Sequence, residues 1–274
     1  MYNFIKRFKK NPVLVRNRDN LWEAEAVFNC SPVLSGKQVH LLYRALSAPQ
    51  TVDGKEIRLS SIGYASSQDG FNFKERRQFI KPENEWEKYG CEDPRATFFE
   101  GKYYIFYTAL GTFPFSAEGI RVGVATTKDF TKVEEKHLVT PFNAKAMSLF
   151  PERIKGKIAV ILTVNTDKPP ARVAIAYLNK KEDMFSRDFW EDWYKSFERF
   201  SLPLKRSSID HTEAGPPPLK TRRGWLFFYS YIQNYFSSSP LFTIEAALLD
   251  LKNPTKIIAR AREPLLLPEE EYEK

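Results

Sequence analysis

The chain has 274 residues, of which 42% are hydrophobic and 28% charged, and its formal net charge is +8. This composition indicates a folded globular protein, in one large domain or two small ones, and excludes an intrinsically disordered chain. The basic residues are spread along the sequence, and the densest run, Lys6 to Lys10, is too short to indicate nucleic-acid binding. If the charge serves binding, a small anion such as phosphate is the expected partner.

Cysteine content and hydropathy bear on the compartment. Cys30 and Cys91 allow at most one pair, so a reducing compartment is the default expectation. The N-terminal MYNFIKRFKK lacks the apolar core of a signal peptide, and no window holds about 18 consecutive apolar residues. We therefore expect a cytoplasmic protein with no membrane partner.

Four segments along the chain share one pattern: a proline, a short run, a turn around glycine, and then a strand rich in apolar residues. This pattern predicts a hairpin with a glycine turn. In chain order the segments are SPVLSGKQVHLLYRA from Ser31, DPRATFFEGKYYIFYTA from Asp93, FPERIKGKIAVILTVNT from Phe150, and GPPPLKTRRGWLFFYSY from Gly215.

A further strand is expected after each hairpin, and the endings SSQDG and TTKDF of the first two are near duplicates. A unit of several strands that recurs along the chain indicates an all-β protein of the β-propeller type. Two β-sandwiches would also give regularly spaced strands and remain an alternative. The stretch SRDFWEDWYKSFERF, residues 186–200, predicts a short helix whose aromatic residues form a packing stripe.

In a propeller the first strand of each blade lines the central channel, and the loops that enter these strands meet on one face. GCEDPR, FNCSP, MSLFPER and HTEAGPPP are all such entry segments. A pocket is expected where they converge.

Glu92 and Asp93, within GCEDPR, are the first candidates for acid chemistry. Because neighbouring side chains alternate across a strand, we expect only one of them to face the channel. Pro94 is expected at the beginning of the strand, since it cannot donate a ladder hydrogen bond. Arg95 is a candidate to pair with the carboxylate and so to position it or lower its pKa. An Asp-Pro turn with a surface ion pair explains the same residues.

Glu213, preceded by Asp210 and His211, is the second candidate carboxylate. Inverting glycoside hydrolysis needs an acid and a base, whereas phosphorolysis needs the acid and cations around the phosphate. Arg44 and Lys220 are candidate cations, although solvated surface charges are the commoner case.

Asn29 is a candidate to bind a sugar hydroxyl, but Asn is also common before turns. His211 alone is more often a loop histidine than a catalyst. The sequence has no GxSxG, Walker-type or GxGxxG motif, and its three histidines do not form a metal set by their spacing.

Several motifs follow one another along the chain: WEAEAVFN, LLYRA, GCEDPRATFFEGKYYIFYTA, LFPERIKGK, GPPPLKTRRGWLFFYS and PLLLPEEEYE. Their combination resembles glycoside hydrolase family 130, which contains β-mannoside phosphorylases and some β-mannosidases. The similarity runs from about Asn11 to the end of the chain.

The resemblance implies a five-bladed β-propeller and cleavage of a β-mannosidic bond with inversion. It makes Asp93 the proton donor, acting in phosphorylases through a substrate hydroxyl, and leaves Glu92 a supporting role. It places Arg44 and Lys220 near the sugar and the phosphate. No metal or organic cofactor is implied; inorganic phosphate would be a co-substrate.

Two departures from the family pattern remove expected anion-binding residues. Thr163, Val164 and Asn165 stand where phosphorylases of the family typically carry a His-Arg pair, and Tyr229-Ser230-Tyr231 stands where they typically show Tyr-His-Gly. Glu213 adds negative charge before GPPP, which would repel phosphate but could activate water. These departures favour hydrolysis, while the family and Lys220 favour phosphorolysis.

A third departure is length. Members of the family continue into a final blade beyond the PExxYE segment, so we expect the last blade of this chain to be incomplete, within one catalytic domain of residues 1–274. The leading expectation is phosphorolysis of an oligosaccharide to mannose 1-phosphate. An inverting hydrolase with Glu213 as base and a non-catalytic sugar-binding propeller are the alternatives, and the sequence leaves open whether the protein forms a homo-oligomer.

Overall fold

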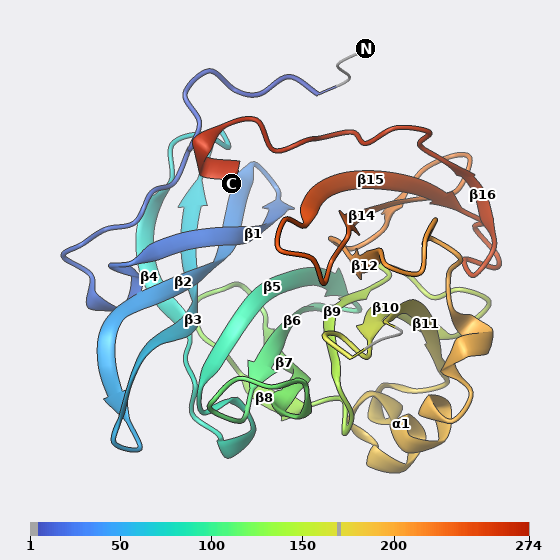
Figure 1. The fold of residues 1–274 in the computed structure, drawn as a ribbon, viewed down its shortest axis with the longest axis horizontal. Helices are drawn as coiled ribbons and strands as arrows, with labels where there is room; N and C mark the ends of the chain where they lie inside the picture. The colour runs from blue at the N-terminus through green and yellow to red at the C-terminus, as the bar shows by residue number, and fades with distance from the viewer. Residues whose placement is uncertain (1–4, 169–170, 274) are drawn as a thin grey trace. The chain divides into compact units, whose positions relative to one another are not determined.

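The computed structural model describes residues 5–168 and 171–273, and in these residues strands dominate and α1 (Arg187–Tyr194) is the only α-helix. The chain divides into two compact units. We call Lys10–Ala146 the N-terminal unit, and Met1–Lys9 with Met147–Lys274 the C-terminal unit. Figure 1 shows that strands close in sequence lie side by side. Among the described residues, no helix reaches the length and hydrophobicity that a bilayer span requires.

The N-terminal unit contains two antiparallel meanders of four strands each. One parallel pairing, between Ser60 and Gly90, connects them. The first meander comprises β1 (Ala26–Ser35), β2 (Gln38–Val52), β3 (Lys55–Ser67) and β4 (Lys74–Ile80), and the second comprises β5 (Gly90–Phe99), β6 (Lys102–Leu110), β7 (Ile120–Thr127) and β8 (Glu135–Leu138).

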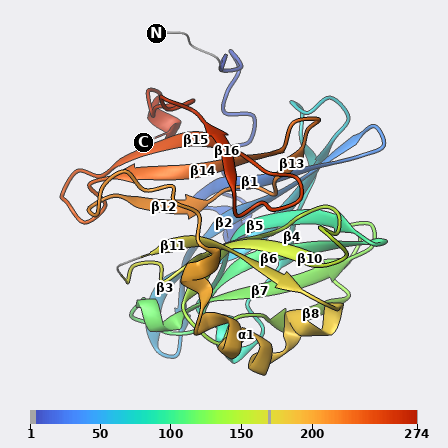
Figure 2. The same ribbon diagram turned by 90° about the vertical axis from the view of Figure 1, so that its right-hand side faces the viewer.

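The C-terminal unit continues the pattern with two further meanders. In the last of them β14 lies between β12 and β15, as Figure 2 shows. β9 (Ala144–Leu149) begins in the last residues of the N-terminal unit. It is followed by β10 (Ile158–Val164) and β11 (Arg172–Leu178), and then by β12 (His211–Ala214), β13 (Leu219–Lys220), β14 (Trp225–Gln233), β15 (Leu241–Leu249) and β16 (Ile257–Arg260).

The described residues also form six short 3₁₀ helices. They are η1 (Leu21–Glu23), η2 (Glu85–Glu87), η3 (Ala117–Gly119), η4 (Lys181–Phe185), η5 (Phe197–Phe200) and η6 (Glu271–Glu273).

The four predicted repeats each form a hairpin followed by an antiparallel strand, which confirms the sequence pattern. Gly36, Gly101 and Gly156 have positive φ, a conformation that glycine adopts without the steric cost of a Cβ. The fourth turn ends at Gly224, whose carbonyl accepts from the Thr221 amide. The strands that follow the hairpins are β3, β7, β11 and β15.

The duplicated SSQDG and TTKDF endings are aspartate-stabilised turns. Asp69 Oδ1 accepts from the amides of Phe71 and Asn72, and Asp129 Oδ1 accepts from the amide of Thr131. A side chain that bonds the backbone two or three residues on fixes a tight turn. The repeat is therefore a turn at the end of β3 and of β7.

In the third meander η4, α1 and η5 follow β11, where the other meanders continue with an outer strand (β4, β8 or β16). α1 begins after Ser186, whose hydroxyl accepts from the Phe189 amide, and it buries Trp190 and Trp193. The predicted stripe of aromatic residues is therefore a packing surface. Further along, Ser201 forms an isolated bridge with Ala174 of β11 and so occupies the outer position.

Candidate active site

A bulge shapes the first strand of both N-terminal meanders. The pairing of β1 with β2 shifts between Phe28 and Ser31, and that of β5 with β6 shifts between Glu92 and Arg95. Asn29 and Asp93 lie within these shifts and have φ values of 48° and 52°. Non-glycine residues with positive φ are strained and often mark functional sites. The two bulges place Asn29 and Asp93 at corresponding positions.

Pro94 lies inside β5 and not at its beginning, so that expectation was wrong. The proline is accommodated by the bulge, where the ladder skips a residue and no amide donor is needed.

Both acids of the pair contact one guanidinium. Arg44 of β2 forms an ion pair with Glu92, and its Nη1 lies 3.6 Å from Asp93 Oδ1. The two acids meet the same guanidinium although side chains alternate along a regular strand, because the bulge turns Asp93 out of the regular pleat. Arg44 is therefore a cation in contact with both acids.

Asp93 is held through one carboxylate oxygen. Asn29 Nδ2 donates to Asp93 Oδ1 at 2.8 Å, and the Arg44 contact also reaches Oδ1. Among the residues that the structure describes, no side-chain partner reaches Oδ2, and the side chain is 20% exposed. Oδ2 is therefore open to a ligand.

The side chain of Glu92 is less exposed than that of Asp93. Its Oε1 accepts from Ser60 Oγ at 3.0 Å, and Ser60 Oγ in turn accepts from Arg44 Nε at 3.1 Å. Burial raises the pKa of Glu92 above its usual value, with Arg44 opposing this shift and Asp93 adding to it. Sequence reasoning missed Ser60, which links the acid to the cation.

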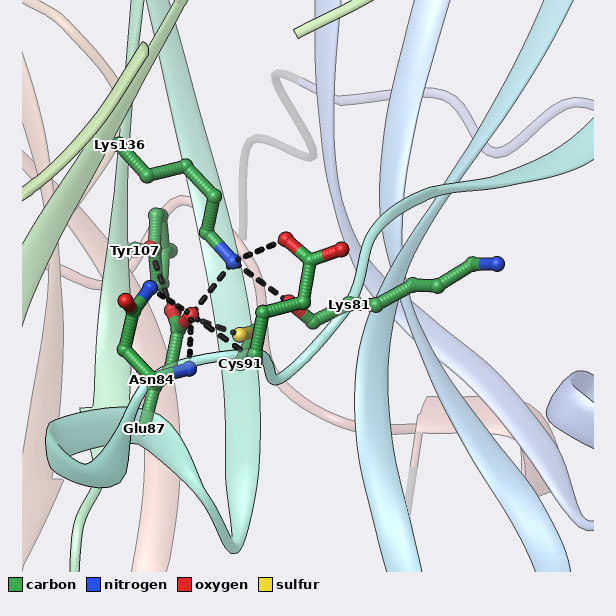
Figure 3. A network of polar contacts seen from close by, with 7 residues as sticks. Lys81, Asn84, Glu87, Cys91, Tyr107 and Lys136 are labelled. Carbon is green, nitrogen blue, oxygen red and sulfur yellow. Dashed lines mark hydrogen bonds and ion pairs between the residues drawn. The ribbon is translucent and has the colours of Figure 1, made fainter.

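A buried glutamate at the end of η2, just before β5, is the centre of the polar network in Figure 3. Glu87 is completely buried, and its Oε2 accepts from Tyr107 Oη at 2.6 Å and from Cys91 Sγ at 3.3 Å. Its Oε1 accepts from Lys136 Nζ and, at 2.8 Å, from Asn84 Nδ2. Burial alone would raise the pKa of Glu87, but the bonds from Lys136 and Tyr107 outweigh it, so the pKa lies below its usual value.

The first meander repeats this network. Glu23, also fully buried, accepts from Asn20 Nδ2 at 2.7 Å, from Tyr43 Oη at 2.9 Å and from Arg76 Nη2 at 2.6 Å. The sequence signal for both networks is a repeated Asn-x-Trp-Glu motif, at residues 20–23 and 84–87. In each copy the tryptophan lies seven residues before the residue in the bulge, Asn29 or Asp93. Tyr43 and Cys91 directly precede Arg44 and Glu92, so each network anchors the strand that carries a site residue.

Glu213, in the C-terminal unit, lies in β12 beside a histidine. Its Oε1 is 3.5 Å from Nε2 of the buried His211, and the His211 ring stacks on Tyr235 at 4.3 Å between centroids. Tyr235 Oη donates to Asp167. Burial and this bond raise the pKa of Tyr235. Asp210 lies apart from this contact and accepts from Tyr231 Oη.

The two cations expected to meet phosphate are already paired with carboxylates. Lys220 of β13, half-exposed, contacts Glu152, and Arg44 contacts Glu92 and Asp93. An incoming anion would have to compete with these carboxylates or share the cations with them. The described residues contain no cluster of three or more His, Cys, Asp or Glu side chains suited to a metal ion.

The substituted positions hold structural contacts. Thr163 Oγ1 accepts from the amide of Ala214, which follows Glu213, and Asn165 Oδ1 accepts from Tyr194 Oη. Tyr229 Oη donates to the buried Glu245 at 2.7 Å, and Glu245 is also bound by both Nη atoms of Arg206. These side chains thus carry tertiary contacts at positions where anion-binding groups were expected.

Comparison with known proteins gives a consistent result. Residues 3–274 match the model of glycoside hydrolase family 130, described as β-1,4-mannooligosaccharide phosphorylase. A 1,2-β-oligomannan phosphorylase of Thermoanaerobacter sp. (strain X514) is 34% identical over 273 residues, which cover 98% of this chain and 84% of that protein.

Solved structures share the fold. The β-1,2-mannobiose phosphorylase of Listeria innocua, in complex with β-1,2-mannobiose, superposes with a TM-score of 0.73 at 24% identity, over 98% of this chain and 85% of that one. Another matches with a TM-score of 0.71 at 21% identity, over 97% of this chain and 81% of the other. The description of that structure states that the family of mannoside phosphorylases contains glycoside hydrolases that target β-1,2-mannosidic linkages in Candida mannan.

Proposed function

Because the chain belongs to glycoside hydrolase family 130, a family of mannoside phosphorylases and glycoside hydrolases, we propose that it phosphorolyses β-1,2-mannosidic bonds of mannooligosaccharides. The name of its oligomannan-phosphorylase relative supports this linkage. Membership makes the chain an enzyme, so the non-catalytic alternative is not retained. We also propose that the four meanders are blades of a five-bladed β-propeller and that residues 1–274 work as one catalytic domain.

In the proposed reaction Asp93 protonates the glycosidic oxygen, directly or through a substrate hydroxyl. A phosphate oxygen attacks C1 from the opposite face, and the electrons of the breaking C1–O bond pass to the protonated leaving oxygen. The product is mannose 1-phosphate with inverted configuration. The observation that carries this role is the strained bulge that fixes Oδ1 of Asp93 through Asn29 and leaves Oδ2 open.

Arg44 and Lys220 are the proposed ligands of phosphate and sugar, with Glu92 and Ser60 orienting Arg44. Arg95 stays a candidate ligand by its place directly after the bulge. Asn29, in this proposal, orients Asp93 and does not primarily bind a sugar hydroxyl.

Hydrolysis is the second candidate, and one observation favours it. Glu213, beside His211, is the carboxylate proposed to activate water, while Lys220 is paired with Glu152. A base next to water suits inverting hydrolysis, whereas phosphate would be repelled by the same carboxylate.

The test is incubation of the protein with β-1,2-mannobiose, with and without inorganic phosphate, followed by product analysis. Phosphate-dependent mannose 1-phosphate is the expected result. Equal release of free mannose in both samples would replace phosphorolysis by hydrolysis. No turnover of β-1,2-, β-1,3- or β-1,4-linked mannobiose in either sample would contradict both.

A further inference from the structure

Three aromatic side chains lie close together in the N-terminal unit, near the start of β5, the strand that carries Glu92 and Asp93. We call them the aromatic platform: Tyr89, just before β5, and Phe113 and Phe115, in the connection from β6 to β7. The Tyr89 and Phe113 rings lie 6.0 Å apart, and Phe113 meets Phe115 edge-on at 5.2 Å and 88°. Phe115 is 53% exposed, so most of a ring face is in contact with solvent and not with the core.

The platform is held in place by polar contacts from its neighbours. Lys55, at the start of β3, donates to the Phe113 carbonyl at 3.1 Å and lies 5.4 Å from the centre of its ring. Tyr89 Oη donates to Asp53 at 2.6 Å, and the Gly111 amide donates to Gly119 across the base of the connection. The rings are therefore presented by an ordered surface, which lowers the entropy cost of binding to them.

The position of the platform relates it to the acid pair. Gly90, the first residue of β5, pairs with Leu110, the last residue of β6, and the Tyr89 amide donates to the Leu110 carbonyl. Asp93 is three residues further along β5, which corresponds to about 10 Å of strand. The platform thus lies at the end of the strand nearest Asp93, beyond the reach of a single sugar bound at the acid.

Sugar rings have an apolar face of C–H groups and a rim of hydroxyls, and binding sites match them with an aromatic surface bordered by polar groups. The platform offers this combination. Lys88 Nζ lies 2.8 Å from Asp53, and both border Tyr89, so donors and acceptors stand next to the rings. We propose that the platform binds a sugar unit of the oligosaccharide remote from the cleaved bond, so that the enzyme prefers chains longer than the disaccharide. This inference rests on the function proposed above.

Exposure of a phenylalanine alone would not support the inference. Phe98 is 52% exposed, and its ring lies 4.9 Å from that of Tyr103. However, Phe98 lies at the far end of β5, next to the Phe99–Lys102 turn, away from Asp93. It therefore serves as a matched control for Phe115 in residue type, exposure and unit.

The experiment compares Phe115→Ala and Phe98→Ala on β-1,2-mannobiose and β-1,2-mannotetraose at fixed phosphate. We expect Phe115→Ala to raise KM for the tetrasaccharide roughly tenfold, with kcat and all disaccharide constants unchanged. Phe98→Ala should match the wild type on both, and Phe115→Trp should retain the preference. Equal losses on both substrates, no loss on the tetrasaccharide, or the same loss in Phe98→Ala would overturn the inference.

A binding measurement separates this inference from the proposed function. Calorimetry of β-1,2-mannotetraose with the Asp93→Asn variant, alone and combined with Phe115→Ala, needs no turnover. Weaker binding in the combined variant supports the platform even if the reaction is not phosphorolysis. Unchanged binding overturns the platform even if wild-type phosphorolysis is observed.

Discussion

At the scale of the residue, the left-handed backbone of Asp93 is the feature on which the proposed chemistry depends. Such a conformation costs about 1–3 kcal/mol at a non-glycine residue, and a fold retains it only where surrounding contacts compensate. Asn29, itself left-handed, and Arg44 supply those contacts at Oδ1. The bulge takes Asp93 out of the regular strand pairing, and its contacts among the described residues hold Oδ1 and not Oδ2, which is consistent with the proposed role of proton donor.

Asp93→Asn removes the acidic proton and keeps the shape of the side chain. We expect kcat to fall by about 10²–10⁴, the usual contribution of a general acid, while affinity for the oligosaccharide is largely kept. Steady-state kinetics and calorimetry measure the two quantities. Asp129→Asn, at an exposed turn in the same unit, is the control and should keep the wild-type rate. Near-normal turnover in Asp93→Asn would remove Asp93 from the mechanism.

Residue types in GCEDPR predicted an acid site next to a cation, but not which cation. Arg95 lies two positions after Asp93, whereas Arg44 lies 49 positions before it, on β2, and contacts both acids. The contact of Arg44 with both acids depends on the one-residue bulge in β5. The bulge in turn depends on how β5 and β6 pair along their length. That information lies in the pairing and not in the hexapeptide.

At the scale of the element, each N-terminal meander is stabilised by a buried glutamate, a tyrosine and a cation. Tyr43 pairs with Gly63 and Tyr107 with Gly123, and a Cβ on either glycine would come within 2.4 or 2.6 Å of the tyrosine ring. The last meander also has a tyrosine bound to a buried glutamate, but there the glutamate, Glu245, occupies the strand position opposite Tyr229, where the two N-terminal meanders have a glycine. The repeat therefore preserves the network and not the residue that supplies the carboxylate.

Lys136→Met tests the stabilising role of this network, because it leaves Glu87 buried without its cation. Removing one partner of a buried ion pair costs about 3–5 kcal/mol, so the free energy of unfolding in urea should fall by about that amount. Lys128→Met is the matched control: Lys128 is 69% exposed and pairs with Glu134 at the surface, where the loss should be at most about 1 kcal/mol. Equal effects of the two substitutions would show that the buried network does not stabilise the unit.

At the scale of the whole molecule, the repeat was predictable because its signals are local. The signal for a glycine turn, an aspartate turn or an apolar strand spans fewer than ten consecutive residues. All four repeats form the expected hairpins. The partners of Glu87 and Glu23 were not predictable in this way, since Lys136 and Arg76 lie about 50 residues from them. The Asn-x-Trp-Glu repeat was the available signal, but its meaning depends on those distant partners.

The C-terminal unit brings segments from opposite ends of the sequence together. The Leu265 amide donates to the Ile244 carbonyl of β15, and beyond that point Arg7 holds the chain. Arg7 binds Glu273 through Nε at 2.6 Å and Nη2 at 2.8 Å, and Nη2 also donates to the Leu267 carbonyl at 2.7 Å. Such a two-point guanidinium–carboxylate contact fixes geometry as well as charge.

Arg7→Met should release this contact without altering the strands. We expect amide hydrogen exchange in residues 267–273 to become severalfold faster, because the backbone beyond the Ile244–Leu266 bridge loses its side-chain anchor, while exchange in β14 and β15 stays unchanged. Lys6 is the neighbouring residue and is exposed. Lys6→Met also removes one positive charge, and it should leave exchange at the wild-type rate. If both variants speed exchange equally, net charge and not the Arg7–Glu273 contact holds the segment. If neither does, the pairing with β15 suffices to hold it.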